Sequence, residues 1–300
     1  MSAQKILITG GSGFLGKHLI DRLAEKNCHV NILTRQKAAK FPEFYWSPEK
    51  NEIDLKAIDQ VETIIHLAGA NLGEGRWTAT RKKEIIDSRV QSASLLFNSL
   101  SSISHSVKTF ISASAIGIYG DTYDEWIDEN HSPSDNFLSE TCLQWESVAN
   151  RFLEIGIRVV ILRIGIVLSK DGGALPQLAL PVKLFAGSPL GTGNQYMSWI
   201  HINDLGSVFL KAIEDKNMSG VYNAVAPNPV ANKEFIKTLA HLFHRPVWPF
   251  AVPVFILKIL LGEKSMIVLE GQRVTSKKIQ DLGFKFQFEN LEAALKNIYK

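Results

Sequence analysis

The sequence predicts an α/β protein, a doubly wound parallel sheet with a smaller C-terminal lobe on the substrate side. Apolar, β-branched runs alternate with helical patterns through the first two thirds of the 300 residues, which is typical of parallel strands covered by helices on both faces. From about residue 168, glycine and proline divide the chain into shorter elements. The expected strands span residues 5–9, 30–34, 63–67, 109–114 and 158–164, and the expected later helices span about 78–100 and 138–155.

The length is greater than one hydrophobic core usually serves, so we expect two regions. The first is a nucleotide-binding domain over residues 1–167, with the segment of about 196–225 returning to it. The second is the substrate-side lobe over residues 168–300, which includes a C-terminal segment of about 247–300.

A glycine-rich turn joins the first expected strand to a helix. Gly11-x-Gly13-x-x-Gly16 matches the dinucleotide fingerprint, in which glycines allow a tight turn, a close approach of backbone N–H groups to a pyrophosphate, and close helix packing. A second strand over residues 30–34 completes the βαβ unit, so the sheet is predicted to be of the Rossmann type. The cofactor-binding residues expected in this turn are Gly10, Gly11, Ser12, Gly13, Phe14, Leu15 and Gly16.

The end of the second strand predicts which dinucleotide binds. An NAD site needs an acidic residue there for the ribose hydroxyls, but this chain has Thr34 and Arg35. A guanidinium binds a 2′-phosphate through charge-assisted hydrogen bonds, which favours NADP(H). The alternative is that Arg35 is a solvated loop charge.

The same turn overlaps most of a P-loop. After Gly16 and Lys17, however, the next residue is His18, where a P-loop has the Ser or Thr that binds magnesium. No apolar strand ends in the acidic metal partner of such enzymes, which disfavours nucleoside triphosphate hydrolysis.

Composition excludes several classes of protein. A hydrophobic fraction of 45% and a charged fraction of 21% are ordinary for a globular protein, and a net charge of +3 with interspersed signs gives no nucleic-acid footprint. Two cysteines, Cys28 and Cys142, do not make a disulfide scaffold and fit a reducing cytoplasm. The first strand is expected close to the start of the sequence, so we expect no signal peptide.

The most apolar stretch, residues 252–261, is too short to span a bilayer and carries Lys258. Its length favours a buried helix that lines a pocket over a helix that lies on a membrane surface. We therefore expect no stable membrane insertion.

Several motifs occur together and in order. They are Thr9-Gly-Gly-Ser-Gly-Phe-Leu-Gly16, Ile65-His-Leu-Ala-Gly69, Ser112-Ala-Ser114 with Ile118-Tyr-Gly120, and Trp199-Ile-His-Ile-Asn-Asp204. In these motifs the chain resembles the extended short-chain dehydrogenase/reductases of the nucleotide-sugar epimerase type. Gly75-Arg-Trp77, Asp87-Ser-Arg-Val90 and Met197-Ser-Trp-Ile-His201 make it more similar to an atypical branch, the sugar-nucleotide-epimerase-like "epimerase family" proteins, over essentially its full length.

The resemblance implies further cofactor contacts. Thr34 and Arg35 would hold the adenosine phosphate end, while Leu67, Ala68 and the turn at Gly69 would line the wall beside the adenosine ribose. On the following helix, Glu84 and Arg89 match positions that face the cofactor, and Val167 would lie near the nicotinamide. The alternative for Glu84 and Arg89 is a pair of exposed helix charges in a charged run.

Two polar residues have structural explanations. His66 precedes the glycine-containing turn without a spaced set of metal ligands, which favours a packed, hydrogen-bonded histidine. Asp204 is expected to cap a helix that starts at Leu205.

The usual catalytic pair of this superfamily, a Tyr with a Lys four residues later, is absent because no tyrosine here has that lysine. Aligning the helix at 137–146 places Leu138 and Cys142 at the two positions. Ser114 and Tyr119 are the predicted catalytic residues, because both are expected beside the nicotinamide site, where they could polarise a carbonyl. Two alternatives are Cys142, if its thiolate is stabilised, and Glu140, if its pKa is raised.

Two functions are consistent with these features. The first is an NADP-dependent oxidoreductase or epimerase acting on a small polyhydroxylated or carbonyl substrate, with Arg163, Lys183 and Trp199 on the substrate side. The second is a binding protein that senses NADPH and passes its occupancy to a partner. Either is expected to be a monomer or a homodimer.

Overall fold

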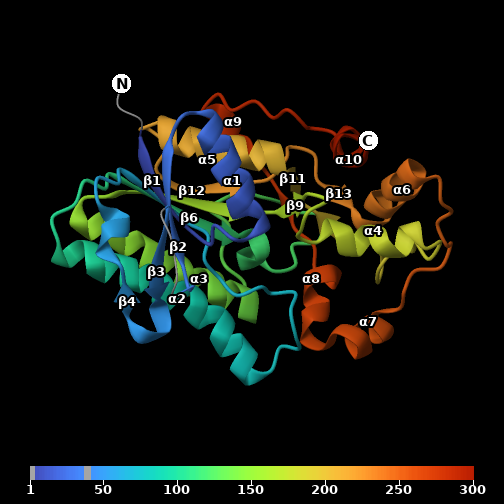
Figure 1. Ribbon diagram of the computed structural model, residues 1–300. Helices are drawn as coiled ribbons and strands as arrows, with labels where there is room; N and C mark the ends of the chain where they lie inside the picture. The colour runs from blue at the N-terminus through green and yellow to red at the C-terminus, as the bar shows by residue number, and fades with distance from the viewer. Residues whose placement is uncertain (1–3, 37–41) are drawn as a thin grey trace.

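The computed structural model describes residues 4–36 and 42–300 (Figure 1). In this part of the chain an eight-stranded sheet has the order β12-β8-β6-β5-β1-β2-β3-β4, and all its pairs are parallel except β3 with β4. The strands are β1 Lys5–Thr9, β2 His29–Thr34, β3 Glu43–Ser47, β4 Glu52–Ile53, β5 Thr63–His66, β6 Thr109–Ala115, β8 Arg158–Ile164 and β12 Gly220–Ala224.

The strand order places a topological switch point between β1 and β5. From β1 the chain proceeds outward through β2 and β3, and then returns to the other side of β1 as β5. The loops after β1 and β5 therefore leave the sheet in opposite directions and open a crevice at its carboxyl edge, where doubly wound folds bind ligands.

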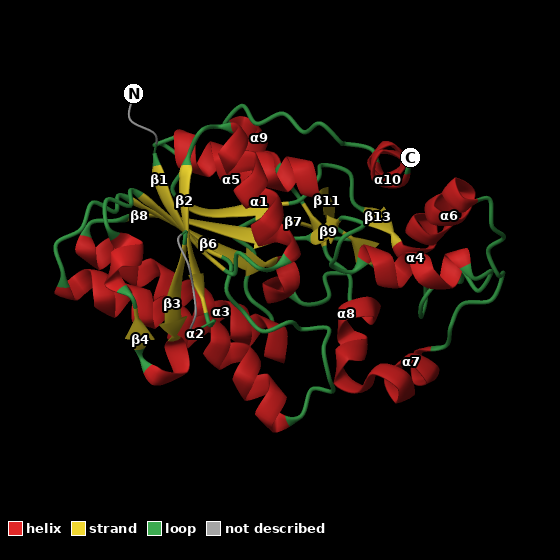
Figure 2. Ribbon diagram, viewed as in Figure 1, coloured by secondary structure: helices red, strands yellow, loops and turns green. Residues whose placement is uncertain are grey.

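Helices cover both faces of the sheet (Figure 2). On one face lie α1 Phe14–Glu25 and α5 Ile202–Glu214, and on the other lie α2 Ala79–Ser102 and α3 Phe137–Asn150. Successive residues of β1 point to opposite faces, so Ile6 and Ile8 join the core under α1 and α5 while Leu7 joins the core under α2. Burial on both faces explains why the strands are continuous apolar runs.

The second lobe has a core of its own around Trp199 and Phe235. Its main helices are α4 Leu175–Lys183, α6 Asn232–Phe243 and α10 Leu291–Tyr299, and its other helices are α7 Val254–Leu261, α8 Met266–Leu269 and α9 Lys277–Asp281, of which α9 lies against β12. Two short strand pairs join the lobe to the sheet domain: β9 Ile166–Leu168 with β11 Trp199–His201, and β7 Trp126–Ile127 with β14 Arg273–Val274. A third pair, β10 Tyr196–Met197 with β13 Val230–Ala231, lies within the lobe.

The predicted fold class is confirmed, and the predicted strands and helices are present with ends shifted by a few residues. The sequence analysis missed β3 and β4. Strand β3 is short, half-buried and next to the outer edge of the sheet, so it lacks the apolar run that marked the central strands.

The prediction of a buried helix at 252–261 is wrong. Helix α7 does form, but within it only Leu257 is buried, and Phe255 and Ile259 are 63% and 70% exposed. Only a small part of the helix packs on the rest of the lobe, so most of its apolar surface lies outside any core. Among residues 4–36 and 42–300, no helix combines the length and hydropathy required to cross a bilayer.

The predicted cap at Asp204 is also wrong. The N-cap of α5 is His201, whose Nδ1 accepts a hydrogen bond from the Asn203 amide at 3.1 Å. The Asp204 carboxylate instead accepts from the amides of Gln287 and Phe288, at 2.8 and 2.9 Å. Asp204 therefore holds the C-terminal segment against α5.

Candidate functional site

The glycine-rich turn between β1 and α1 has the shape that its sequence predicts. Gly10 has a φ of +72°, and a Cβ there would lie 2.9 Å from the carbonyl carbon of Leu67. A Cβ on Gly16 would lie 2.4 Å from the carbonyl oxygen of Gly10, so only glycine lets α1 approach the turn this closely. The two glycines bring the turn against the loop that follows β5.

The start of α1 is open toward an anion. A Cβ on Gly13 would meet only the carbonyl oxygen of Gly10, at 3.3 Å, and no side chain among the described residues caps this helix. The first-turn N–H groups are therefore left to bind water or a ligand. These features fit the pyrophosphate of a dinucleotide.

Thr9 connects the two loops of the crevice. Its Oγ1 accepts hydrogen bonds from the amides of Leu67 and Ala68, at 3.1 and 3.2 Å, and its hydrogen is directed to Nδ1 of His66 at 2.9 Å. The other ring nitrogen of His66 then carries the hydrogen and donates to Ser92 at 3.2 Å. Burial lowers the pKa of His66 to about 3, so it is a neutral, packed histidine, as predicted.

Arg89 supports the loop after β5 from below. Its guanidinium donates to the carbonyls of Ala70 and Ile85, stacks over the Trp145 ring and lies directly under Gly69, where a Cβ would come within 2.9 Å of its central carbon. Burial lowers its pKa to about 10, which leaves it charged at neutral pH. The charge therefore lies beside the crevice, but its hydrogen bonds go to backbone.

The remaining predicted cofactor residues lie on four different elements or loops. Thr34 ends β2, which lies next to β1, and Arg35 follows it and is exposed. Glu84 is exposed on α2 and pairs with Arg81 at 2.7 Å. Val167 lies in β9, and its carbonyl packs on Gly173 beside the Phe14 ring.

Ser114, at the end of β6, belongs to a buried polar network. Its hydroxyl donates to Oε1 of Glu146 at 2.7 Å, and Glu146 accepts two further hydrogen bonds from Arg163, both at 2.9 Å. Arg163 also donates to the hydroxyl oxygen of Tyr119 at 2.9 Å. The hydrogen bonds to the carboxylate raise the pKa of Arg163 despite the cost of its burial.

Tyr119 is oriented by the network on both sides. Its hydroxyl accepts from Arg163 and donates to Oδ1 of Asn223 at 2.8 Å. Burial raises the pKa of Tyr119 to about 12, so the phenol stays protonated at neutral pH. Asn223 is fixed in turn, because its backbone N–H donates to Glu129 at 2.7 Å and its side-chain amide donates to the Thr275 carbonyl at 3.3 Å.

The two positions that usually hold Tyr and Lys are apolar or neutral here. Leu138 packs on Gly117, and Cys142 contacts the Ala115 carbonyl at 3.6 Å. Burial raises the pKa of the Cys142 thiol to about 11, which argues against a stabilised thiolate. Glu140 lies on the exposed side of α3, bonded to Gln144 at 3.1 Å, away from this network.

The residues predicted on the substrate side have other contacts. Trp199 is fully buried and donates to the Asn228 carbonyl at 3.0 Å, so its assignment to a substrate surface is wrong. Lys183 lies over the rings of Phe243 and Tyr299. Arg163 is bound to Glu146, as described.

The sequence analysis missed Glu146. Two sequence signals pointed to it: Glu146 follows Leu138 and Cys142 at helical spacing, on the same face of α3, and Arg163 lies in a buried strand where a charge needs a partner.

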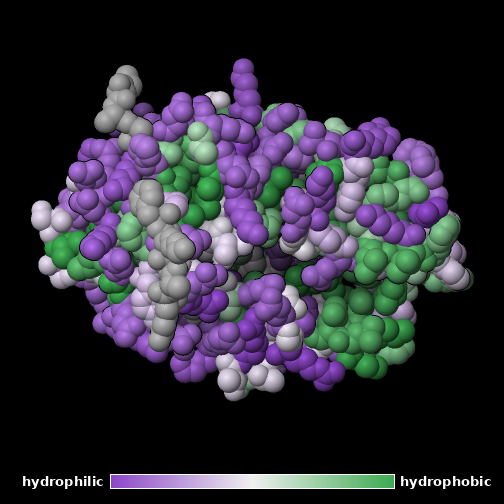
Figure 3. Space-filling model, viewed as in Figure 1, coloured by the Kyte–Doolittle hydropathy of each residue, from purple (hydrophilic) through white to green (hydrophobic). Residues whose placement is uncertain are grey.

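The loop over residues 69–77 is bridged to the second lobe. Lys264 donates to the Gly73 carbonyl at 3.1 Å, and Lys82 forms an ion pair with Glu263. Figure 3 shows this face of the molecule hollowed near its centre, between the sheet domain and the lobe.

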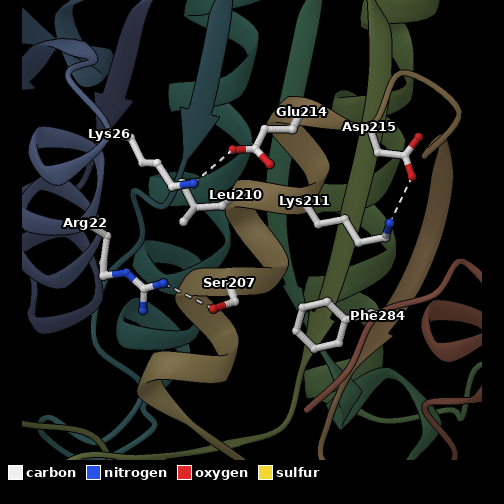
Figure 4. Close-up of a pocket in the computed structure, with 8 residues that line it drawn as sticks. All are labelled: Arg22, Lys26, Ser207, Leu210, Lys211, Glu214, Asp215 and Phe284. Atoms are coloured by element: carbon white, nitrogen blue, oxygen red, sulfur yellow. Dashed lines mark hydrogen bonds and ion pairs between the residues drawn. The ribbon is translucent and has the colours of Figure 1, made fainter. Parts of the chain in front are cut away.

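A separate, shallow groove lies between α1 and α5, lined by residues such as Arg22, Lys211 and Phe284 (Figure 4). Its charges already have partners: Lys26 lies 3.7 Å from Glu214, and Lys211 lies 3.0 Å from Asp215. These residues lie at the ends of α1 and α5 far from the glycine-rich turn, so the groove is not part of the crevice.

Comparisons with known proteins agree with this geometry. Residues 6–224 match the NAD dependent epimerase/dehydratase family, and residues 252–298 match a domain of unknown function, DUF1731. Epimerase family protein YfhF of Bacillus subtilis is 39% identical over 98% of this chain and 97% of its own. Epimerase family protein SERP0438 of Staphylococcus epidermidis is 38% identical over 99% of both chains.

Two solved structures are similar over almost the whole chain. The human epimerase family protein SDR39U1 (isoform 2), crystallised with NADPH, is 28% identical with a TM-score of 0.90 and covers 98% of this chain and 99% of its own. A nucleoside-diphosphate sugar epimerase from Corynebacterium glutamicum is 30% identical with a TM-score of 0.81, and the match covers 99% of this chain and 58% of that protein.

Proposed function

The chain belongs to the NAD dependent epimerase/dehydratase family, and we propose that it is an NADP(H)-binding, epimerase-like oxidoreductase. Its substrate would be a small sugar-nucleotide-like or carbonyl compound, held between the carboxyl edge of the sheet and the second lobe. The reaction would proceed without the usual Tyr and Lys pair.

One observation carries the cofactor proposal: an uncapped, glycine-lined helix start lies at the switch point of the sheet, next to an exposed arginine. The helix start suits a pyrophosphate, and Arg35 at the end of β2 suits a 2′-phosphate where a carboxylate would repel it. The similar human protein was crystallised with NADPH, which supports the same choice of dinucleotide.

The proposed site uses both loops of the crevice. Residues 10–16 would bind the pyrophosphate, Thr34 and Arg35 the adenosine phosphate, and Leu67, Ala68 and Gly69 the wall beside the ribose. Arg89 would act through the loop that it supports, with Glu84 at the rim and Val167 near the nicotinamide. The nicotinamide, when bound, supplies hydride transfer.

Of the two predicted catalytic residues, Ser114 is better placed to pass on a proton, because its hydroxyl donates to a carboxylate. Because its hydrogen is directed to Glu146, the Ser114 oxygen would act as the acceptor of a hydrogen bond from a substrate hydroxyl. A proton taken up at Oγ of Ser114 passes on to the Glu146 carboxylate, while Arg163 remains charged beside it. Tyr119, with its raised pKa and two hydrogen-bond partners, orients Arg163.

A second function is favoured by a different observation. Leu138 and the neutral thiol of Cys142 occupy the positions of the usual proton donor and its lysine. A chain that binds NADPH tightly and leaves it unchanged would be a sensor that reports cofactor occupancy to a partner.

We further propose that the two regions divide near residue 167, and that the protein acts in a reducing, cytoplasmic compartment as a monomer or homodimer. The buried Cys142 and the half-exposed Cys28 are both free thiols, which is consistent with that compartment.

The two functions separate in one experiment. The protein is mixed with NADPH or NADP⁺ and a panel of sugars, nucleotide sugars, aldehydes and ketones, while nicotinamide absorbance and thermal stability are recorded. An oxidoreductase changes the absorbance with at least one substrate, and the Ser114→Ala variant loses that change. A sensor is stabilised by NADPH with every substrate inert.

A further inference from the structure

The second lobe presents an exposed apolar surface that no core explains. Among the described residues, large apolar side chains more than half exposed cluster at the end of α4 and over residues 248–260, with only Tyr123 and Leu153 elsewhere. We call this surface the apolar cap, and its principal members are Leu184, Phe185, Trp248, Phe250, Phe255 and Ile259. Figure 3 shows apolar side chains gathered at the lower right, where Figure 1 places α7.

The two halves of the apolar cap are held together as one surface. The Trp248 indole donates to the Phe185 carbonyl at 2.8 Å, and the Trp248 amide donates to the Gly187 carbonyl at 2.9 Å. Val252 pairs with Leu190 in an isolated parallel bridge. These bonds fix the cap, so it is a built surface of the folded lobe.

The cap projects outward. Phe250 is 79% exposed and Leu184 is 68% exposed, so these side chains stand clear of their neighbours instead of lining a groove. Projecting apolar side chains suit a deformable partner that surrounds them, as the acyl region of a bilayer does.

The two segments that form the cap carry only basic charge, and the acidic residue that follows α7, Glu263, is paired with Lys82. The sequence has no acidic residue between Asp171 and Asp204 or between Glu234 and Glu263, the two segments that form the cap. The same segments contain Lys183, Arg245 and Lys258, and Lys258 is exposed on α7 between Phe255 and Ile259. Arg245 stacks over the Phe185 ring, within the cap itself.

This charge disfavours a second copy as the occupant. A symmetric dimer through the cap would bring each Lys258 toward basic residues of the other chain, with no acid from these two segments to pair with them. An anionic surface has the complementary charge. Apolar and aromatic side chains flanked by lysine and arginine are the composition of a helix that lies in a membrane interface.

We propose that the apolar cap docks the second lobe on anionic lipid bilayers, with the α7 side chains entering the headgroup boundary and Lys258 and Arg245 at the level of the lipid phosphates. The contact is peripheral, since α7 is too short to span. It does not depend on the cofactor or on any reaction.

The test is co-sedimentation of the full-length protein with vesicles of phosphatidylcholine containing roughly one third phosphatidylglycerol, and with vesicles of phosphatidylcholine alone. We expect binding to the anionic vesicles and at least about fivefold weaker binding to the neutral ones. Lys258→Glu should weaken anionic binding by about fivefold or more, and Phe255→Ser with Ile259→Ser by about tenfold or more. Trp248 fluorescence should shift to the blue with anionic vesicles, and this shift should be absent in Trp248→Phe.

Matched controls lie on the sheet domain: Lys50→Glu and Leu153→Ser change an exposed lysine and an exposed leucine far from the cap and should bind as the wild type does. The proposal is overturned if vesicles do not sediment the wild type, if neutral and anionic vesicles bind equally, or if the cap variants bind unchanged. It is also overturned if the wild type is a dimer without vesicles and the double variant is a monomer, because the occupant is then a second copy. An acidic protein partner would leave the vesicles unbound.

Discussion

Glu146 accepts hydrogen bonds from Ser114 at 2.7 Å and from two nitrogen atoms of Arg163 at 2.9 Å, and its side chain is only 9% exposed. A buried carboxylate is thereby held next to the serine that the sequence motifs mark as catalytic. The charged residues of this site come from two elements, Glu146 from α3 and Arg163 from β8. The superfamily pattern would instead place a tyrosine and a lysine, both on α3.

The buried pair should be costly to break from one side. Glu146→Gln leaves the Arg163 guanidinium without its counter-charge, so we expect the free energy of unfolding to fall by about 3 kcal/mol. Adding Arg163→Met to this variant removes the unpaired guanidinium charge, so the double variant should regain at least about 1 kcal/mol of unfolding free energy. Urea unfolding of the single and double variants measures both values. A single variant within about 0.5 kcal/mol of wild type would show that the pair carries little stability.

Cys142 should be chemically silent in the folded protein. Burial and the nearby Glu146 raise the pKa of its thiol to about 11, so almost no thiolate is present at neutral pH. Iodoacetamide treatment followed by mass spectrometry should label Cys142 only after unfolding, and the half-exposed Cys28 serves as the internal comparison. Rapid labelling of native Cys142 would return it to the catalytic candidates.

Acid should destabilise the protein through its buried histidines. The pKa is about 3 for His66 and about 4 for His201, against about 6.5 in the unfolded chain, with burial as the main cause. Between these values the unfolded state binds more protons, so stability is full above pH 6.5 and falls as pH falls, by up to about 1.4 kcal/mol per unit for each histidine.

The variant His66→Asn isolates one of these contributions. Its unfolding free energy, measured by urea titration from pH 7 to pH 4.5, should fall less steeply than that of the wild type below pH 6.5, by up to about 1.4 kcal/mol per pH unit, whatever its stability at pH 7. Equal slopes would mean that His66 is protonated in the native state as easily as in the unfolded one.

Arg35 is proposed to distinguish the two dinucleotides. Arg35→Asp replaces the partner of a 2′-phosphate with a repulsive charge, so NADPH affinity should fall by roughly 30-fold, while NADH affinity should change by less than about threefold. Calorimetric titrations of both nucleotides give the two ratios. Equal losses would remove Arg35 from the phosphate site.

The central strands of the sheet domain were predictable because each is buried on both faces and therefore forms an apolar run in the sequence. Thr9 and His66 were also open to inference, since both end strands that must lie side by side. The Ser114–Glu146–Arg163 network was harder to predict from the sequence, because it joins residues up to 49 positions apart, on one face of α3 and at the ends of two strands.

The second lobe escaped prediction for a different reason. Its short elements carry little periodicity, and apolar composition alone does not tell a buried helix from an exposed one. Helix α7 is the clearest case. Its high hydropathy predicted a buried helix that lines a pocket, but in the structure most of its apolar side chains are exposed. Trp199 shows the reverse, since it was expected to face substrate and is fully buried.

The central claim is that backbone N–H groups of the turn at residues 10–16 bind the pyrophosphate of NADP(H). Isothermal titration calorimetry of the purified protein with NADPH tests it, with Gly13→Asp as the matched variant, because that position has an ordinary φ of −71° and a Cβ there would meet only the Gly10 carbonyl oxygen, at 3.3 Å. We predict a saturable heat for the wild type that Gly13→Asp abolishes while its thermal unfolding stays cooperative. The account is contradicted if neither NADPH nor NADP⁺ gives heat with the wild type, or if Gly13→Asp binds NADPH unchanged.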